Sequence, residues 1–321
     1  MTRRTKLVLP VLMVAILLLA GGIVFYLHPL GVVDQITRSV LWIRGVRSEY
    51  ANVAGYRLHY LEARPAHGDS GKTLLLVHGL GGRSEDWAGL IPAMTAAGFH
   101  VYAPDLLGYG RSDRPDVSYS ISMQEDVLAK FMQAMHLAHA DVAGWSMGGW
   151  VSMRLALDHP QSVDRLVLYD SAGVYFPPTF DPDLFTPRDR EEVSRLLAML
   201  SPRARHMPGF VSDAVVRRLS RNAWVVHRSA VAMMTGNDLL DFRLNDLKQP
   251  TLVVWGSRDD LIPLPVGRRI GALIPNASLM VIDGCGHMAP VECWRPVAKG
   301  TIDFLRQEST VSGAEKGATG N

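Results

Sequence analysis

The stretch Asp141–Trp150, DVAGWSMGGW, places a serine between two glycines directly after an apolar run. Glycine is costly inside regular structure, so a pair at this spacing indicates a backbone forced into a sharp turn. Ser146 lies at the centre of the turn, with Gly144 and Gly148 two residues away on either side. An apolar strand before it and a helical pattern after it are the context of a G-x-S-x-G nucleophile elbow, which would expose the Ser146 hydroxyl.

Strand patterns recur on both sides of this turn, from about residue 50 to residue 307. A hairpin is predicted to turn at Ala54–Gly55, and buried strands are predicted at 73–77, 99–104, 141–145, 165–170, 251–255 and 278–283. Because helical patterns separate these apolar runs, we expect a mostly parallel central sheet flanked by helices on both faces. The core is therefore assigned to residues 50–171 and 244–307.

The segment 172–243 is far longer than one crossover between strands needs, and its helical patterns predict a helical lid inserted above the sheet. Some of its large apolar side chains are candidates for lining an apolar pocket, although for each of them packing within the lid is the simpler role. These side chains are Met199, Met207, Phe210, Trp224, Met233 and Met234.

The N-terminal segment 1–28 carries three cations and then an uncharged run, Leu7–Leu27. A helix of that length spans about 30 Å, the thickness of a bilayer core, so we predict a transmembrane anchor. A cleaved signal peptide is the alternative, with a weak small-residue site at Ala20–Gly22, but the apolar run continues past that site. The leading cations predict a cytoplasmic N-terminus and a catalytic domain outside the cytoplasm, on the periplasmic side if the source is bacterial.

Residues 29–49 follow the anchor, and apolar side chains recur among them at helical spacing, with arginines between. This pattern fits an amphipathic juxtamembrane helix on anionic lipid, and it equally fits a linker helix packed on its own domain. At the other end of the chain, residues 308–321 are small and polar and are predicted to be a disordered tail.

Composition excludes several classes of function. The chain has 321 residues, of which 48% are hydrophobic and 20% charged, so it buries a substantial core. A net charge of +2 without a basic block argues against a nucleic-acid partner. Cys285 and Cys293 show no zinc-site spacing, and a bridge between them is possible but not expected.

A serine nucleophile needs a base, and the base needs a carboxylate that orients it. His287 follows the last predicted strand in GCGHMAP, and Asp259 and Asp260 follow the strand before it in WGSRDDLIP. Loops at the carboxyl ends of parallel strands converge on one edge of the sheet, so these side chains and Ser146 are predicted to meet there. The order Ser, Asp, His is that of the α/β-hydrolase triad.

The negative charge that develops on a substrate carbonyl oxygen also needs hydrogen-bond donors. The sequence HGLGG, His78–Gly82, follows a predicted strand and supplies glycine-rich backbone at the same edge of the sheet. The N–H groups of Leu80 and Met147 are the candidate oxyanion hole. His78 is expected to tie the loop down and not to act as a second base.

Five motifs together resemble the α/β-hydrolase fold superfamily over about residues 50–307: HGLGG, PDLLGYGRSDRP, GWSMGG, WGSRDDLIP and GCGHMAP. The resemblance implies Asp259 as the triad acid, with Pro263 closing the W-G-x-x-D-x-x-x-P pattern and Asp260 as a bystander. Asp170 matches the acid position of a minority of members and is a reserve candidate. A serine at the elbow argues against the branches that use aspartate there, haloalkane dehalogenases and epoxide hydrolases.

Within that superfamily the anchor, the S-M-G-G elbow, the helical lid and C-G-H look like the membrane-bound monoacylglycerol lipases. The same elbow and C-G-H also resemble C–C hydrolases of meta-ring-fission products, which tend to carry Asn before the nucleophile and Trp after the histidine. Trp145 and Met288 stand at those positions here.

The sequence therefore predicts a membrane-anchored serine carboxylic-ester hydrolase that acts on monoacylglycerols or related lipid esters. Its triad would be Ser146, Asp259 and His287, with no metal and no cofactor. Two alternatives remain: a C–C hydrolase of ring-fission products, and a catalytically silent receptor with the same fold.

Overall fold

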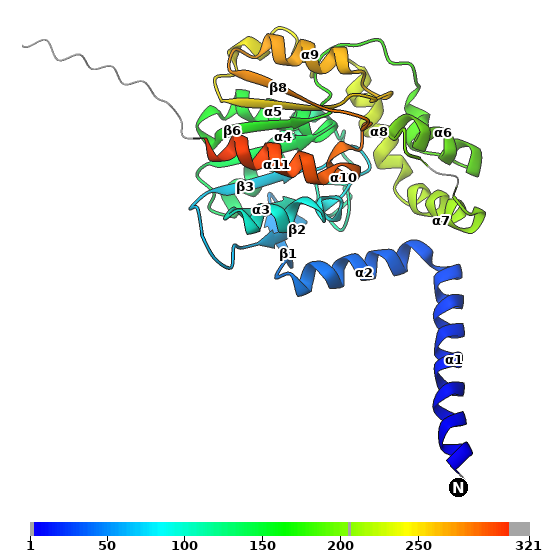
Figure 1. Ribbon diagram of the computed structural model, residues 1–321. Helices are drawn as coiled ribbons and strands as arrows, with labels where there is room; N and C mark the ends of the chain where they lie inside the picture. The colour runs from blue at the N-terminus through cyan, green and yellow to red at the C-terminus, as the bar shows by residue number, and fades with distance from the viewer. Residues whose placement is uncertain (1–2, 205–206, 308–321) are drawn as a thin grey trace, which may run out of the picture.

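Two helices precede the body of the protein and meet at a sharp bend. The computed structural model describes residues 3–204 and 207–307, so the predicted tail 308–321 lies outside the described residues. Helix α1 spans Arg3–Leu27 and projects away from the body, whereas α2, Pro29–Ile43, lies along it (Figure 1). Pro29 is pre-organised for the first position of a helix, which starts α2 in a new direction.

The bend bears on the predicted anchor. Within the described residues, none of the helices is by itself both long and apolar enough to cross a membrane. Leu12–Leu27 and Pro29–Ile43 meet that test only as a pair, bent by 108°.

Eight strands of the described chain form one sheet in the order β1-β2-β4-β3-β5-β6-β7-β8. The six strands from β4 to β8 in this order run parallel, and β1 and β2 are antiparallel at one edge. The strand bounds are β1 Arg47–Val53, β2 Tyr56–Ala63, β3 Thr73–Val77, β4 His100–Pro104, β5 Ala140–Trp145, β6 Val163–Tyr169, β7 Thr251–Gly256 and β8 Ala277–Ile282.

The edge hairpin turns where the sequence predicted, because Ala54 and Gly55 both adopt positive φ angles of 53° and 86°. Its first strand begins earlier than the predicted core boundary at residue 50. Arg47 already pairs with Glu62 of β2, so the juxtamembrane segment ends before residue 47 and not at 49. Cross-strand pairing, which single-strand periodicity does not reveal, sets this boundary.

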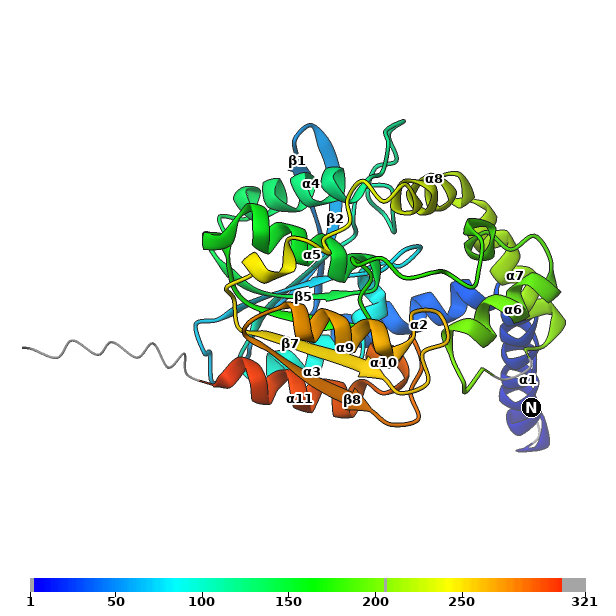
Figure 2. The same ribbon diagram turned by 90° about the horizontal axis from the view of Figure 1, so that it is seen from above.

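Helices cover both faces of the sheet, as alternation of strands and helices requires (Figures 1 and 2). One face packs against α4, α5 and α9, and the other against α3, α11 and the end of α2. These helices span α3 Leu90–Ala96, α4 Ile121–Ala134, α5 Met147–Asp158, α9 Leu264–Leu273 and α11 Trp294–Arg306, with the short α10 at Ala289–Glu292.

The helical insertion, residues 172–243, lies between β6 and β7 and beyond the carboxyl end of the sheet (Figure 1). It contains α6 Arg190–Leu200, α7 Gly209–Ser220 and α8 Ala223–Met234. Helix α7 ends just before Asn222 and α8 begins just after it. The Asn222 side chain donates to the Gly108 carbonyl at 2.9 Å. That bond fixes the insertion to the loop after β4.

Candidate active site

Ser146 occupies a strained turn between the end of β5 and the start of α5, with φ 56° and ψ −121°. Positive φ is uncommon for a residue with a side chain and is typical of a nucleophile elbow. The flanking glycines are required by close contacts. A Cβ on Gly144 would lie 2.3 Å from the Gly148 carbonyl oxygen, and one on Gly148 would lie 2.2 Å from the Val77 carbonyl oxygen.

His287 and Asp259 form a buried pair in the loops after β8 and β7. His287 Nδ1 lies 2.8 Å from Asp259 Oδ2, and both side chains are almost fully buried. The second Asp259 oxygen accepts the N–H groups of Leu261 and Ile262, each at 2.9 Å. Since the carboxylate accepts from Nδ1–H, the Nε2 atom of His287 is left as the acceptor, which is the tautomer a general base requires.

Trp145, which directly precedes Ser146, links the end of β5 to the loop that carries His287. Its indole Nε1–H donates to the His287 carbonyl at 2.8 Å. The sequence marked Trp145 only as a departure from the C–C hydrolase pattern, because a hydrogen bond spanning this much of the chain has no local signal.

The two other carboxylates considered for the acid role have different surroundings. Asp260 is exposed. Asp170 is fully buried, with one oxygen accepting the Gly256 N–H at 2.7 Å and the other without a partner among the described residues. Burial, together with the charge of Asp259, raises the pKa of Asp170 well above its usual range. Asp170 is therefore a buried carboxyl with a raised pKa beside the pair that Asp259 makes with His287.

The glycine-rich loop after β3 passes directly over Ser146. A Cβ on Gly79 would lie 3.1 Å from the Ser146 Cβ. Leu80 lines the same cavity as Ser146, and Met147 is the first residue of α5, so its N–H has no acceptor within the helix. His78 ties the loop down, since its Nε2 accepts the Leu106 N–H at 3.0 Å and its Nδ1 lies 2.8 Å from the Gly79 carbonyl oxygen.

Ser146 and His287 open into a cavity of about 610 Å³ between the sheet edge and the helical insertion. Its walls are apolar, and no Lys, Arg, Asp or Glu side chain is among the described residues that line it. Met233 and Met234 line the cavity, whereas Phe210 packs against α1 and Trp224 packs against Tyr119. The largest share of the wall comes from aromatic and aliphatic side chains of the insertion, including Phe176, Phe180, Phe185, Leu196, Leu197, Leu200, Val215, Leu219 and Leu239.

Cys285 and Cys293 are joined by a disulfide that encloses the His287 loop, with Cα atoms 6.5 Å apart. The expectation of unpaired thiols is therefore wrong. The sequence separation of 8 gave no hint of the pairing, which depends on how α10 folds back on the loop after β8. The bridge closes a short loop around the histidine and limits its motion.

We predict that reducing this bridge weakens the fold. Loop-closure entropy for so short a loop corresponds to about 2.5 kcal/mol in the free energy of unfolding. Urea unfolding of the purified chain, with and without reductant, measures the difference, and the double variant Cys285→Ala/Cys293→Ala should no longer respond to reductant. An identical unfolding midpoint for reduced and oxidised wild type would contradict this prediction.

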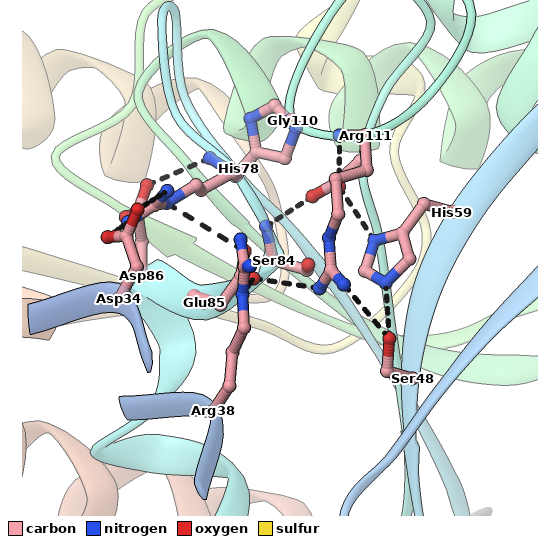
Figure 3. Close-up of polar contacts among 12 residues, drawn as sticks. Asp34, Arg38, Ser48, His59, His78, Ser84, Glu85, Asp86, Gly110 and Arg111 are labelled. Carbon is pink, nitrogen blue, oxygen red and sulfur yellow. Dashed lines mark hydrogen bonds and ion pairs between the residues drawn. The ribbon is translucent and has the colours of Figure 1, made fainter. Parts of the chain in front are cut away.

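Ser48, His59 and Asp105 form a Ser–His–Asp chain of hydrogen bonds, and none of the three lines the cavity. Figure 3 shows Ser48 beside His59. His59 joins Ser48 Oγ at 3.1 Å and Asp105 Oδ2 at 2.7 Å. Although burial opposes it, the hydrogen bond from His59 and the Ser84 N–H help to hold the pKa of Asp105 down to about 2. Asp105 also accepts the Arg111 N–H, and Ser48 lies in the regular strand β1 and not at a strained turn. This chain of bonds ties β1 and β2 to the loop after β4.

Comparison with known proteins agrees with this geometry. Residues 72–292 match the family model for the alpha/beta hydrolase fold. A 2-hydroxymuconate semialdehyde hydrolase from a Pseudomonas species is 33% identical over 258 residues, covering 74% of this chain and 88% of that protein. A 2-hydroxy-6-oxo-2,4-heptadienoate hydrolase from Pseudomonas putida is 32% identical over 259 residues, covering 74% and 91%.

Among solved structures, a bacterial membrane phospholipase A superposes with a TM-score of 0.77 at 26% identity, covering 92% of this chain and 97% of its own. The strained serine, the order of the sheet and the matched family model lead to one assignment. The chain belongs to the α/β-hydrolase fold family and is a hydrolase of that fold.

Proposed function

We propose that the protein is a serine carboxylic-ester hydrolase whose substrates are membrane lipid esters, monoacylglycerols or their relatives. The observation that carries this proposal is the cavity: a space of about 610 Å³ with apolar walls ends at Ser146 and His287 and has no charged side chain among its described lining. An acyl chain gains free energy on leaving water for such a space, whereas a charged substrate group loses its hydration there.

The proposed reaction is acyl transfer. His287 Nε2 accepts the proton of Ser146, whose oxygen attacks the ester carbonyl, while Asp259 stabilises the imidazolium that forms. The N–H groups of Leu80 and Met147 hold the oxyanion, each donor contributing about 3 kcal/mol in the transition state. His287 then protonates the leaving alcohol and activates the water that releases the acyl group from Ser146.

The proposal places the N-terminal helices at a membrane. The match to the membrane phospholipase A covers 92% of this chain, which is more than the residues after Ile43 make up. It therefore includes part of the N-terminal segment that forms α1 and α2. In the proposal α1 is a membrane anchor with a cytoplasmic N-terminus and residues 172–243 are the lid over the cavity. The disulfide favours placement of the body in an oxidising compartment outside the cytoplasm.

C–C hydrolysis is the second candidate, because the two Pseudomonas relatives are named as hydrolases of 2-hydroxymuconate semialdehyde and of 2-hydroxy-6-oxo-2,4-heptadienoate. A dienoate substrate carries a carboxylate, which usually requires a cationic partner when it is buried. No Lys or Arg lines the described cavity, and this favours the ester.

One panel tests the choice. Long-chain monoacylglycerol, diacyl phospholipid and a 2-hydroxy-6-oxo-dienoate are each supplied to the full chain in detergent micelles, with a short-chain soluble ester as reference. We expect the highest kcat/KM on a long-chain ester, and the lipid that is cleaved fastest identifies the head group. Turnover of the dienoate with no turnover of any ester would overturn the proposal in favour of C–C hydrolysis.

A further inference from the structure

One carboxylate on α2 joins three parts of the molecule. Asp34 accepts bonds from Arg83 at 2.6 and 3.3 Å and from Arg218 at 3.2 and 2.7 Å, so both guanidinium groups bind it through two nitrogens. Its side chain is only 14% exposed. Although burial raises the pKa of Asp34, the bonds and charges of Arg83 and Arg218 outweigh this effect and lower it, so the group is ionised at neutral pH.

The first partner belongs to the active-site loop. Arg83 directly follows Gly79–Gly82, and its backbone N–H donates to Asp86 Oδ2 at 2.9 Å. A second bond from α2 meets the same turn, because Arg38 donates to the buried Glu85 at 3.0 Å. Figure 3 shows Asp34 and Arg38 reaching from α2 to this turn. Helix α2 therefore fixes the end of the loop that passes over Ser146.

The second partner belongs to the helical insertion. Arg218 lies in α7, and its neighbours Val215 and Leu219 line the cavity. The same helix also meets α1, since Phe210 stacks on Tyr26 with ring centroids 5.0 Å apart. Asp34 thus binds two arginines that neighbour different parts of the cavity wall, Arg83 next to the Gly79–Gly81 stretch and Arg218 in α7.

We propose that Asp34 is a positioning residue for the reaction, through which the juxtamembrane helix holds both the oxyanion loop and α7 in place. In this account α2 is a structural part of the active site as well as a connection to the anchor. Because Asp34 touches no substrate atom, its effect is on geometry: the N–H donors must be placed to within a fraction of an ångström. The kinetic part of the inference rests on the proposed ester hydrolysis, and the structural part does not.

The test compares Asp34→Asn with wild type in the full chain in detergent micelles. Asparagine keeps the shape of the side chain but removes the charge that two arginines share. We expect kcat on a short-chain soluble ester to fall about 10- to 100-fold, the cost of a small displacement at a reacting centre, with KM changed far less. Backbone hydrogen exchange of residues 79–89 and 209–220 should become faster.

Two further variants make the result specific. Asp303→Asn removes one carboxylate from an exposed pair with Lys299 on α11, and it should leave both the rate and the exchange unchanged. Arg218→Gln cuts only the bond to α7, so exchange should rise in 209–220 and not in 79–89. Thermal unfolding of each variant confirms that it is folded.

The outcomes separate the two claims. Unchanged exchange in both segments of Asp34→Asn would overturn the inference whether or not esters are cleaved. Faster exchange with an unchanged kcat on the ester would also overturn it. Faster exchange in a protein whose wild type cleaves no ester would support the positioning role and contradict the proposed function.

Discussion

Replacing Ser146 with alanine should lower kcat for ester hydrolysis by about 10⁴- to 10⁶-fold, the scale seen when a triad nucleophile is removed. In the proposed reaction the Ser146 oxygen is the atom that forms the bond to the acyl group. The small rate that remains without it comes from the oxyanion donors and from substrate binding. Steady-state kinetics on the best substrate of the ester panel measures the loss.

Ser48→Ala is the matched control for this variant, because Ser48 contacts a histidine that is paired with an aspartate. It should leave kcat close to wild type, since Ser48 lies outside the cavity. A large loss in Ser48→Ala with a small loss in Ser146→Ala would assign the nucleophile to Ser48 and its chain through His59 and Asp105.

Asp259→Asn should lower kcat by about 10⁴-fold, because an amide in place of the carboxylate favours the wrong histidine tautomer. The unfolding midpoint should change little, since the amide oxygen still accepts from backbone N–H groups. The neighbouring variant Asp260→Asn removes the same charge from an exposed side chain and should stay within about twofold of wild type.

Asp170→Asn completes the series. Burial and the charge of Asp259 raise the pKa of Asp170, which favours its protonated form. An uncharged amide is a close substitute for that form, so the rate should change little. A wild-type rate in Asp259→Asn combined with a large loss in Asp170→Asn would move the acid role to Asp170.

The elements with local signals could be predicted from the sequence. The turn at Ser146 needs glycines at fixed positions, and the strands are apolar runs, so β3 and β7 were located to within a residue. The order Ser146, Asp259, His287 placed these residues in loops at one edge of a parallel sheet, and the structure brings Asp259 and His287 into contact there.

Contacts between distant segments could not be predicted in the same way. The Cys285–Cys293 bridge depends on the path of α10, and the role of Trp145 depends on a carbonyl far along the chain. Asp34 lies in the amphipathic segment 29–49. The pattern of that segment fitted both a helix on a lipid surface and a helix packed on the protein's own domain. The two arginine partners of Asp34 come from segments far away in the sequence, so only the folded chain shows that α2 packs on the body.

The most direct test of the central claim is covalent labelling of the full chain with alkyl fluorophosphonates of increasing chain length, followed by mass spectrometry of the modified peptide. These reagents label an activated serine and leave their alkyl group in the cavity. We expect the adduct on Ser146, with a labelling rate that rises as the alkyl chain lengthens. An adduct on another residue, no adduct at all, or a rate independent of chain length would contradict a lipid-ester hydrolase built around Ser146.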